Sequence, residues 1–422
     1  MQLLIQQAKI VDPRSEHHNQ TADLLIEDGI ITAIGTNIEA KNAKIITDHN
    51  LHVSTGWTDI FADYREPGYE HKETIATGLA AAAAGGYTDV LTVPNTYPVV
   101  STKSIVQYLL QTAGGNVVNL HPCGSATQNA EGKTLAEMMD MRANGAIAFT
   151  DGWKPIQNAG LMQKALEYIK AFNGILLQMP VDDALAEGGL MHEGPVSTRL
   201  GMAGIPALAE TLMVHRDIEL LRYTGSRLHI TGISVAESVE KIRAAKKEGL
   251  QVTCSVTPYH LALTDDALIT YKSVYKVSPP LRNEADRQAL IAGLKDGTID
   301  CIASHHRPHE WDAKTKEFEY AADGMNVQEM AFSIVYNAIG TQVPMHTIIH
   351  ALSTAPRAIF GLPALGIAKG GKACLTLFSP DDSTIYTDDT IKSLSRNNPF
   401  IDKKMKGRVL GIINNDNFVS NI

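Results

Sequence analysis

The feature that most constrains the fold is a repeated alternation, through the middle of the chain, of short apolar β-branched runs with helical stretches. This alternation predicts βα units packed around a parallel sheet. Eight such runs spread over about 250 residues are what a (β/α)8 barrel requires. The runs lie near residues 57–60, 88–93, 117–122, 146–150, 174–179, 228–232, 251–255 and 300–304.

Helical stretches separate these runs and end in glycine-containing turns. Residues 73–84 are rich in alanine and stop at Gly85-Gly86, and residues 238–249 and 286–294 also carry helical patterns. Glycine just beyond the last helical residue is a common helix stop. A doubly wound open sheet is the alternative, but it usually has fewer units and often a glycine-rich phosphate turn. The sequence contains no GxGxxG, GxxxxGK[ST] or GxSxG motif.

Both ends of the chain have β character. The β-rich runs 24–26 and 30–34 flank Glu27-Asp28-Gly29, a strong hairpin signal, and residues 373–378 and 408–413 are strand-like. We therefore expect one small β module made of residues 1–54 plus 365–422, beside a barrel of residues 55–364. Two unrelated β tails are the alternative.

Composition limits the partners and the compartment. The net charge of −9 argues against a nucleic-acid or anionic-membrane partner. No apolar run approaches the roughly 20 residues of a membrane span, and the polar start MQLLIQQAKIVDP does not fit a signal peptide. The four cysteines lie far apart with no CxxC pair, as expected for reduced thiols. These features predict a cytoplasmic protein.

Chemistry in a barrel is expected at the carboxyl ends of the strands. Residues with polar or unusual side chains follow the predicted strands there: Phe61, Asp63, Arg65, Asn95, His121, Asp151, Met179, Gly232, His260, His305, His306, Arg307 and His309.

Four segments carry a resemblance to a known family. They are REPGYEHKETIATG (65–78), AAAAGGYTDVLTVPNTYPV (81–99), VTPYHLALTDDAL (256–268) and SPPLRNEADRQALIAGLKDGTIDCIAS (278–304). The similarity spans nearly the whole chain and resembles the dihydroorotase branch of the amidohydrolase superfamily. It implies a (β/α)8 TIM-type barrel with a small β-sandwich module formed by both termini. It also implies a zinc-dependent closure of carbamoyl aspartate to dihydroorotate in pyrimidine biosynthesis.

The metal-ligand positions implied by the resemblance are degenerate. The family's first-strand His-x-His corresponds to Phe61 and Asp63, and its fifth-strand histidine to Met179. The sixth-strand histidine corresponds to Gly232, and the eighth-strand aspartate, a ligand and proton-transfer residue, to His305. A fourth-strand carboxylate remains as Asp151, although the family's second aspartate there is Gly152.

These replacements predict that the family's zinc pair is not held. Zinc takes nitrogen, sulfur and oxygen ligands, which Phe61 and Gly232 lack, and the Met179 thioether is a poor ligand. We expect no cofactor and assign no catalytic residue. A single-metal site of Asp63, Asp151 and His305 is the alternative, in which case zinc would bind. The interpretation without a metal is that Asp63 forms a salt bridge or caps a loop and that His305 is a polar residue with its hydrogen bonds satisfied.

Three further residues match family positions that contact substrate. Arg65 corresponds to the arginine that binds the substrate carboxylate, Asn95 to the asparagine beside it, and His309 to the last histidine of the eighth-strand motif. A guanidinium suits a carboxylate. The alternative is that these side chains stabilise the barrel mouth, and a weak affinity for a dicarboxylate is consistent with both.

The leading hypothesis is an inactive dihydroorotase-like protein, a pseudoenzyme that has kept the barrel. By family analogy it is a structural partner of aspartate transcarbamoylase and a homodimer. The alternative is an active zinc-dependent dihydroorotase or related cyclic amidohydrolase with a rearranged metal site. A third hypothesis is a protein that binds a dicarboxylate without turnover.

Overall fold

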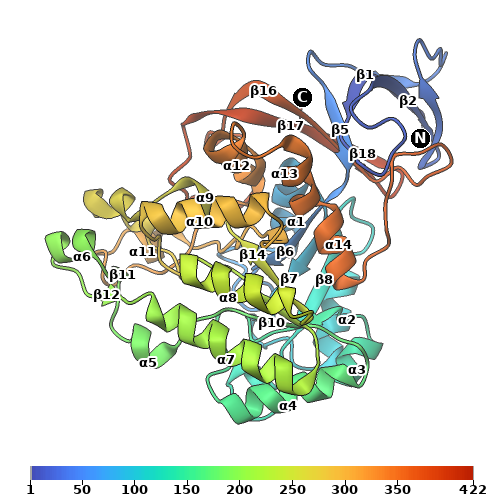
Figure 1. Cartoon of the computed structure of the whole chain (residues 1–422). Helices are drawn as coiled ribbons and strands as arrows, with labels where there is room; N and C mark the ends of the chain where they lie inside the picture. Colours follow the sequence, from blue (N-terminus) through green and yellow to red (C-terminus); the bar gives the residue numbers. More distant parts are fainter. Residues whose placement is uncertain (1, 422) are drawn as a thin grey trace.

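The computed structural model describes residues 2–421 and contains a parallel barrel with a β module beside it (Figure 1). The barrel sheet has eight parallel strands in the order β6-β7-β8-β9-β10-β13-β14-β15. Its two edges approach where the backbone N–H of Asp63 donates to the carbonyl of His306 at 2.9 Å. The strands are β6 (Trp57–Ala62), β7 (Tyr87–Thr92), β8 (Asn119–Gly124), β9 (Ala148–Phe149), β10 (Leu176–Gln178), β13 (Leu228–Ile230), β14 (Val252–Val256) and β15 (Cys301–Ile302). The (β/α)8 prediction and its eight strands are confirmed.

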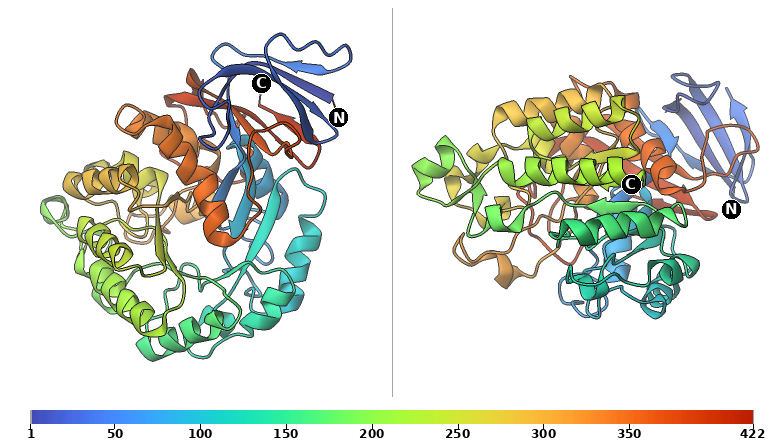
Figure 2. Two further views of the ribbon diagram at one scale, coloured as in Figure 1. Left: turned by 45° about the vertical axis from the view of Figure 1, so that its right-hand side comes forward. Right: turned by 60° about the horizontal axis from the view of Figure 1, so that its bottom comes forward.

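Helices cover the outside of this sheet as an arc (Figure 2). The principal ones are α1 (Ile75–Ala84), α2 (Lys103–Thr112), α3 (Met138–Ala143), α4 (Ala159–Lys170), α7 (Leu208–Thr224), α8 (Ala236–Lys247), α10 (Glu284–Lys295), α12 (Ala331–Ile339), α13 (Met345–Leu352) and α14 (Thr354–Phe360). Helix α1 begins after Thr74, whose hydroxyl accepts the N–H of Thr77, and ends at Gly85, as predicted. Glycine is required at Gly85, since a Cβ there would lie 2.4 Å from the carbonyl oxygen of Gln328. None of the helices within residues 2–421 is long and apolar enough to cross a bilayer.

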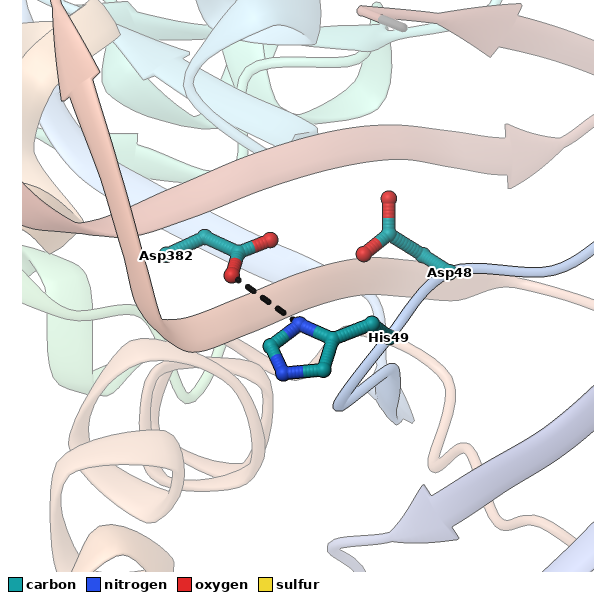
Figure 3. A group of neighbouring side chains, drawn as sticks. All are labelled: Asp48, His49 and Asp382. Atoms are coloured by element: carbon teal, nitrogen blue, oxygen red, sulfur yellow. Dashed lines mark ion pairs between the residues drawn. The ribbon is translucent and has the colours of Figure 1, made fainter.

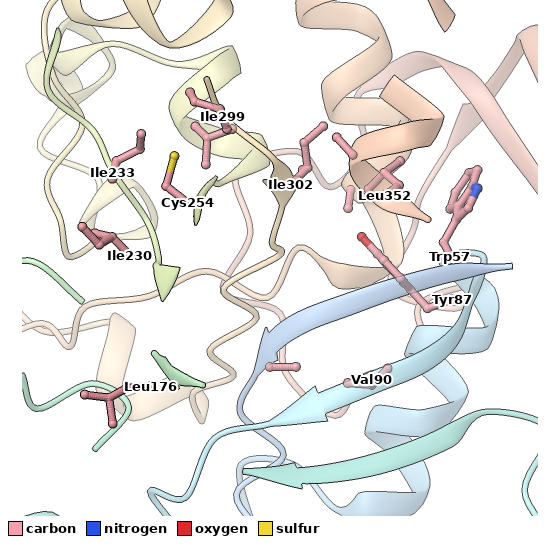
Figure 4. Packing of buried hydrophobic residues seen from close by; sticks show 14 of the residues in the cluster. Trp57, Tyr87, Val90, Leu176, Ile230, Ile233, Cys254, Ile299, Ile302 and Leu352 are labelled. Carbon is pink, nitrogen blue, oxygen red and sulfur yellow. The ribbon is translucent and has the colours of Figure 1, made fainter. Parts of the chain in front are cut away.

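The main hydrophobic core lies between the barrel strands and these helices. Trp57 and Tyr87 are fully buried in it beside Ile302 and Leu352 (Figure 4). Removing this apolar surface from water is the dominant stabilising contribution to the fold. Phe378 of the C-terminal region joins the same cluster, so the β module is anchored to the barrel through apolar contacts.

The β module combines strands from both ends of the chain. Its sheet has the order β18-β17-β16-β5-β1-β2-β3, with β4 paired to β1. The predicted hairpin is present, since β2 and β3 are antiparallel across Asp28-Gly29. Leu24 and Leu375, from opposite ends, share one buried cluster. The strands are β1 (Gln2–Ile10), β2 (Thr21–Glu27), β3 (Ile30–Gly35), β4 (Lys44–Ile46), β5 (His52–Thr55), β16 (Leu375–Ile385), β17 (Lys404–Asn414) and β18 (Asn417–Ser420).

Two segments depart from the simple pattern. The connection between β16 and β17, residues 386–403, packs on the barrel, where Ile391 and Phe400 join a cluster with Tyr259 and Leu281. The predicted boundaries had placed this connection in the β module. The other segment precedes α7 and contains α5 (Asp183–Ala186), β11 (Met191–His192), α6 (Pro195–Leu200) and β12 (Gly204–Ile205); short helices α9 (Pro258–Ala262) and α11 (Trp311–Lys314) lie in later loops.

Candidate functional site

Three aromatic rings pack together at the carboxyl ends of the barrel strands. The rings of Phe61 and His305 are stacked, with centroids 4.4 Å apart and planes 28° apart. Trp153 meets both of them edge to face, at 5.0 Å from Phe61 and 5.5 Å from His305. We call Phe61, Trp153 and His305 the ring cluster. It brings together two of the predicted metal-ligand positions in an apolar contact.

His305 fills the space beside Gly232. A Cβ on Gly232 would lie 2.5 Å from Cε1 of His305, so a larger side chain at this sixth-strand position requires His305 to move. The Nε2 of His305 pairs with the hydroxyl of Thr231 at 2.8 Å. Burial lowers the pKa of His305 well below its usual value, and the ring is therefore neutral at physiological pH.

The carboxylate of Asp63 is fully buried and pairs with neighbouring hydrogen-bond donors. One carboxylate oxygen pairs with the guanidinium of Arg65 at 3.0 Å and accepts the indole N–H of Trp153 at 2.7 Å. The other accepts the backbone N–H of Arg65 at 3.2 Å. These contacts make Asp63 the counter-ion of Arg65.

Asp151 and Asn95 hold the loop after β9. The carboxylate of Asp151 accepts the backbone N–H of Thr127 at 2.9 Å and its hydroxyl at 2.5 Å. Burial raises the pKa of Asp151 to about 6. The amide of Asn95 donates to the carbonyl of Asp151 and accepts the N–H of Trp153, both at 3.0 Å. A Cβ on Gly152 would lie 1.8 Å from this amide oxygen, so an aspartate at that position would require the Asn95 side chain to move.

The side chains at the mouth do not fit a zinc pair. Within residues 2–421, the one group of three His, Cys, Asp or Glu side chains with ligand atoms all within 4.8 Å of one another is Asp48, His49 and Asp382 (Figure 3). That group lies on the β module, and the structure does not bring Asp63, Asp151 and His305 together in the same way. Buried Met179 offers only a thioether.

A cavity of about 700 Å³ lies beside Trp153 of the ring cluster and is rich in cationic side chains. Arg65 and Arg307 both line it, and the guanidinium carbon of Arg307 lies 4.4 Å from the ring centroid of Trp153. His309, the third predicted substrate contact, also lines it; its Nε2 pairs with the carbonyl of Asp323 at 2.8 Å. Burial lowers the pKa of His309 to about 2 and keeps this ring neutral. The structure thus brings Arg65, Asn95 and His309 to one cavity.

Sequence reasoning gave no role to Trp153, Thr231 or Arg307. Arg307 lies between His306 and His309, and an arginine in a loop at a strand end is a signal from which a role in the site could be predicted. Trp153 and Thr231 carry no such signal, because their roles depend on rings that come from distant strands.

Solved structures with a similar fold include proteins named hydantoinase and dihydropyrimidinase. The L-hydantoinase (dihydropyrimidinase) from Arthrobacter aurescens matches with a TM-score of 0.87 and 21% identity, over 99% of this chain and 96% of that chain. A dihydropyrimidinase from Brevibacillus agri matches with a TM-score of 0.84 and 21% identity, over 100% of this chain and 95% of that chain. At this identity the likeness establishes the fold alone.

Curated relatives are considerably more similar in sequence. A dihydroorotase of Syntrophobacter fumaroxidans is 40% identical over 415 residues, covering 96% of this chain and 94% of its own length. A dihydroorotase of Syntrophus aciditrophicus is 37% identical over 414 residues, covering 97% of both chains.

These matches correct one expectation from the sequence. The prediction that no cofactor is implied is wrong, because proteins named dihydroorotase and hydantoinase are typically zinc-dependent amidohydrolases. Zinc is therefore the metal that the kinship implies for this chain. The ring cluster and the hydrogen-bonded carboxylates of Asp63 and Asp151 are a departure from the ligand set that this kinship implies.

The family comparison agrees with the whole-chain matches. The family model described as "Dihydro-orotase-like" matches residues 52–238, which run from β5 into α8. With full-length relatives at 40% identity, the predicted kinship is confirmed: the chain belongs to the dihydroorotase family of the amidohydrolase superfamily.

Proposed function

We propose that this chain is a cytoplasmic dihydroorotase-family protein of de novo pyrimidine biosynthesis that does not close carbamoyl aspartate to dihydroorotate. The observation that carries the proposal is the position of His305, which stacks on Phe61 and fills the space beside Gly232. Two positions that hold zinc ligands in the family, Phe61 and His305, are thereby joined in one apolar contact, and the His305 ring takes the space that a side chain at a third, Gly232, would need.

The chemistry of the reaction supports this proposal. Ring closure needs an electrophile to polarise a carboxyl or amide carbonyl, and the reverse reaction needs hydroxide at neutral pH. A bound zinc ion would supply both, because it polarises the carbonyl as a Lewis acid and lowers the pKa of bound water from about 15.7 to about 7. The residues of this chain supply a different function at the mouth: Arg65 and Arg307 provide positive charge that binds and orients a carboxylate.

The test is turnover of dihydroorotate and of carbamoyl aspartate by protein purified with zinc supplied. The dihydroorotase of Syntrophobacter fumaroxidans, assayed in parallel, is the positive control. We expect no conversion above the zinc-containing buffer blank. Turnover comparable to that of the control would contradict the proposal.

The second candidate function is a working cyclic amidohydrolase with a rearranged metal site. The names of the relatives and structural neighbours favour it. It requires Asp63, Asp151 and His305 to leave their partners Arg65, Thr127 and Thr231 and to converge. Turnover that disappears in both Asp63→Ala and His305→Ala would establish it.

We further propose that the chain is a homodimer that associates with aspartate transcarbamoylase. Family analogy supports this, together with a kept barrel that lacks the family's ligand set. Sedimentation velocity of the chain alone and mixed with the transcarbamoylase of the same cell is the test. A dimer and a larger joint species are expected, whereas independent sedimentation of the two proteins would contradict the partnership.

A further inference from the structure

We propose that residues 182–207 form a flap that opens in acid, and that protonation of His192 releases it from the barrel. The flap runs from the N-cap of α5 to the start of α7 and contains β11, α6 and β12. This inference goes beyond the proposed function, because it concerns a change of conformation and holds whether or not the barrel mouth binds or converts a ligand.

The flap is attached to the rest of the molecule by few buried side chains. Within residues 182–207, only Met191, His192 and Ser197 are buried. Figure 1 shows α6, β11 and β12 at the margin of the molecule, away from the β module. A segment with so little buried surface is expected to open locally at a lower free-energy cost than unfolding of the whole chain.

His192 is 6% exposed, and both of its ring nitrogens face hydrogen-bond donors. Nη1 of Arg282 donates to Nδ1 of His192 at 3.2 Å, and the side-chain amide nitrogen of Asn283 lies 3.4 Å from Nε2. The oxygen of the Asn283 amide is already occupied, since it accepts the N–H of Asp286 at 3.0 Å. Because an arginine only donates, Nδ1 must carry a lone pair. The closed flap therefore requires a neutral His192 ring.

Arg282 is fixed in place by other buried partners. Its side chain is 3% exposed, and its Nε donates to the hydroxyl of Ser234 at 3.0 Å while its Nη2 pairs with Glu210 at 3.6 Å. The same Nη1 that meets His192 on β11 also donates to the carbonyl of Ile205 on β12 at 3.2 Å. Arg282 thus holds both strands of the flap.

Protonation of His192 would turn this contact into a repulsion. The ring would place a second positive charge 3.2 Å from Nη1 of Arg282 and would lose its acceptor. Like charges repel strongly where water is excluded. Since Arg282 has buried partners in the barrel and the flap has few, we infer that the flap is the part that moves.

The other charged groups around His192 do not offset this repulsion. Asp286 on α10 favours the protonated ring, but its carboxylate already accepts the N–H of Ala236 at 2.9 Å. Glu210 on α7 is paired with Arg282, and Glu193, the next residue along the flap, is exposed.

The direction of the pH effect follows from these surroundings. Burial and the charge of Arg282 lower the pKa of His192 to about 4 in the closed flap. In an open flap the ring is solvated and its pKa is about 6.5. Closure is therefore fully stabilised above pH 6.5 and weakens as the pH falls from 6.5 toward 4.

Opening also changes the surface of the barrel. Met191 is fully buried in an apolar cluster that contains Tyr259, Leu268 and Leu281 from the later barrel loops. When the flap leaves, Met191 leaves this cluster with it. The open form therefore exposes apolar surface that the closed form covers.

Hydrogen exchange of the full chain, followed by mass spectrometry at pH 7.5 and pH 5.0 and corrected for the intrinsic exchange rates, tests the proposal. We expect the opening constant of flap peptides to be about 30-fold larger at pH 5.0. Peptides from β7 and β8 should stay far better protected than the flap at both pH values, which marks the opening as local.

Two variants separate the charge of His192 from a general loosening of the flap. His192→Asn keeps an acceptor for Arg282 but does not titrate, so its opening constant should differ less than about 3-fold between the two pH values. The matched control Tyr271→Phe removes the hydrogen bond from the Tyr271 hydroxyl to the carbonyl of Leu200 at 2.9 Å. It should raise opening by a similar factor at both pH values and keep the ratio of about 30.

A second measurement protects the test against misfolding of a variant. Limited proteolysis of the unmodified chain with one protease at both pH values should cut within residues 182–207, about 30-fold faster at pH 5.0 after correction for the activity of the protease. Equal flap opening at the two pH values would overturn the proposal. Persistence of the pH effect in folded His192→Asn, or opening of the flap only together with β7 and β8, would also overturn it.

Discussion

At the residue scale, Gly232 and His305 form one unit. Gly232 has φ of +71°, which disfavours other residues, and a Cβ would also meet the ring of His305 at 2.5 Å. The two effects, backbone strain and overlap with the ring, can be measured separately because the chain contains a suitable second glycine. Gly201 has φ of +67° with nothing within 4 Å of its Cβ position.

The first prediction compares these two glycines. Gly201→Ala should cost about 1 kcal/mol in the free energy of unfolding from backbone strain alone. Gly232→Ala should cost about 1–3 kcal/mol more because of the ring overlap. In the background of His305→Ala, the extra cost of Gly232→Ala should disappear. Urea unfolding of the unmodified chain, Gly201→Ala, Gly232→Ala, His305→Ala and the double variant measures these costs, and an equal cost at the two glycines would contradict the close packing.

The second prediction concerns the counter-ion of Arg65. Asp63→Asn removes the ion pair at 3.0 Å, so the free energy of unfolding should fall by about 3 kcal/mol, since a buried cation is left unpaired. The released guanidinium should bind succinate, a small dicarboxylate used as a probe, several-fold more tightly than in the unmodified chain. Denaturant unfolding and titration calorimetry measure the two effects. Weakened binding would instead indicate that Asp63 positions Arg65 for the ligand.

At the element scale, the connection 386–403 supports the loop after β15. The amide of Asn397 accepts the N–H of His309 at 3.1 Å and donates to the carbonyls of Arg307 at 2.9 Å and Gly324 at 3.1 Å. Asn398, one residue later, bonds instead to Asn326, Phe400 and Met330. Substitutions at these two neighbouring asparagines can therefore distinguish an effect on the site loop from an effect on stability alone.

The third prediction uses this pair. Asn397→Ala and Asn398→Ala should each lower the free energy of unfolding by about 1–3 kcal/mol, because both leave buried partners unsatisfied. Only Asn397→Ala should also weaken succinate binding, since it frees the loop that carries Arg307. Equal binding losses in the two variants would argue against a specific role of this connection at the site.

The element scale also separates what the sequence could predict from what it could not. Each of the eight runs predicted as barrel strands overlaps an observed strand. The predicted strand 300–304 is observed only as Cys301–Ile302, because Ser304 bonds to Asp59 at 3.0 Å and His305 has φ of +49°. The path of residues 386–403 depends on contacts with distant loops, which no local pattern encodes.

At the scale of the whole molecule, buried neutral histidines make stability depend on pH. Burial lowers the pKa of His229 to about 3 and of His260 to about 4. The unfolded chain takes up these protons near pH 6.5 while the folded chain does not. The stability that these two neutral rings contribute is therefore complete above pH 6.5. It is lost as the pH falls from 6.5 toward the pKa values of the folded chain. Burial raises the pKa values of Asp151 and Asp217 to about 6. These two carboxyl groups therefore increase the free energy of unfolding as the pH falls, opposite to the histidines.

The fourth prediction isolates one of these histidines. His229→Gln should make the loss of unfolding free energy between pH 6 and pH 5 smaller by about 1.4 kcal/mol. The control variant His215→Gln, at an exposed histidine of α7, is measured in parallel, and the effect of His229→Gln should exceed its effect. Urea unfolding at the two pH values measures this difference. An unchanged dependence in His229→Gln would show that this ring takes up a proton in the folded state.

The candidate site was partly predictable at this scale. The apolar runs located the strand ends, and the resemblance identified Phe61, Met179 and Gly232 as positions without suitable zinc donors. It could not show that His305 turns onto Thr231 and packs against Phe61, because that contact joins β15 to β13 and β6 across the barrel. The cationic cavity was likewise hidden, since it depends on the stacking of Arg307 on Trp153.

The most direct measurement of the central claim is a crystal structure of the chain grown with zinc and carbamoyl aspartate supplied. We predict that the rings of Phe61 and His305 remain stacked and that Nε2 of His305 stays within hydrogen-bond distance of Thr231, with a carboxylate of the ligand on Arg307. A His305 ring turned away from Thr231 to ligate a zinc ion together with Asp63 would contradict the account.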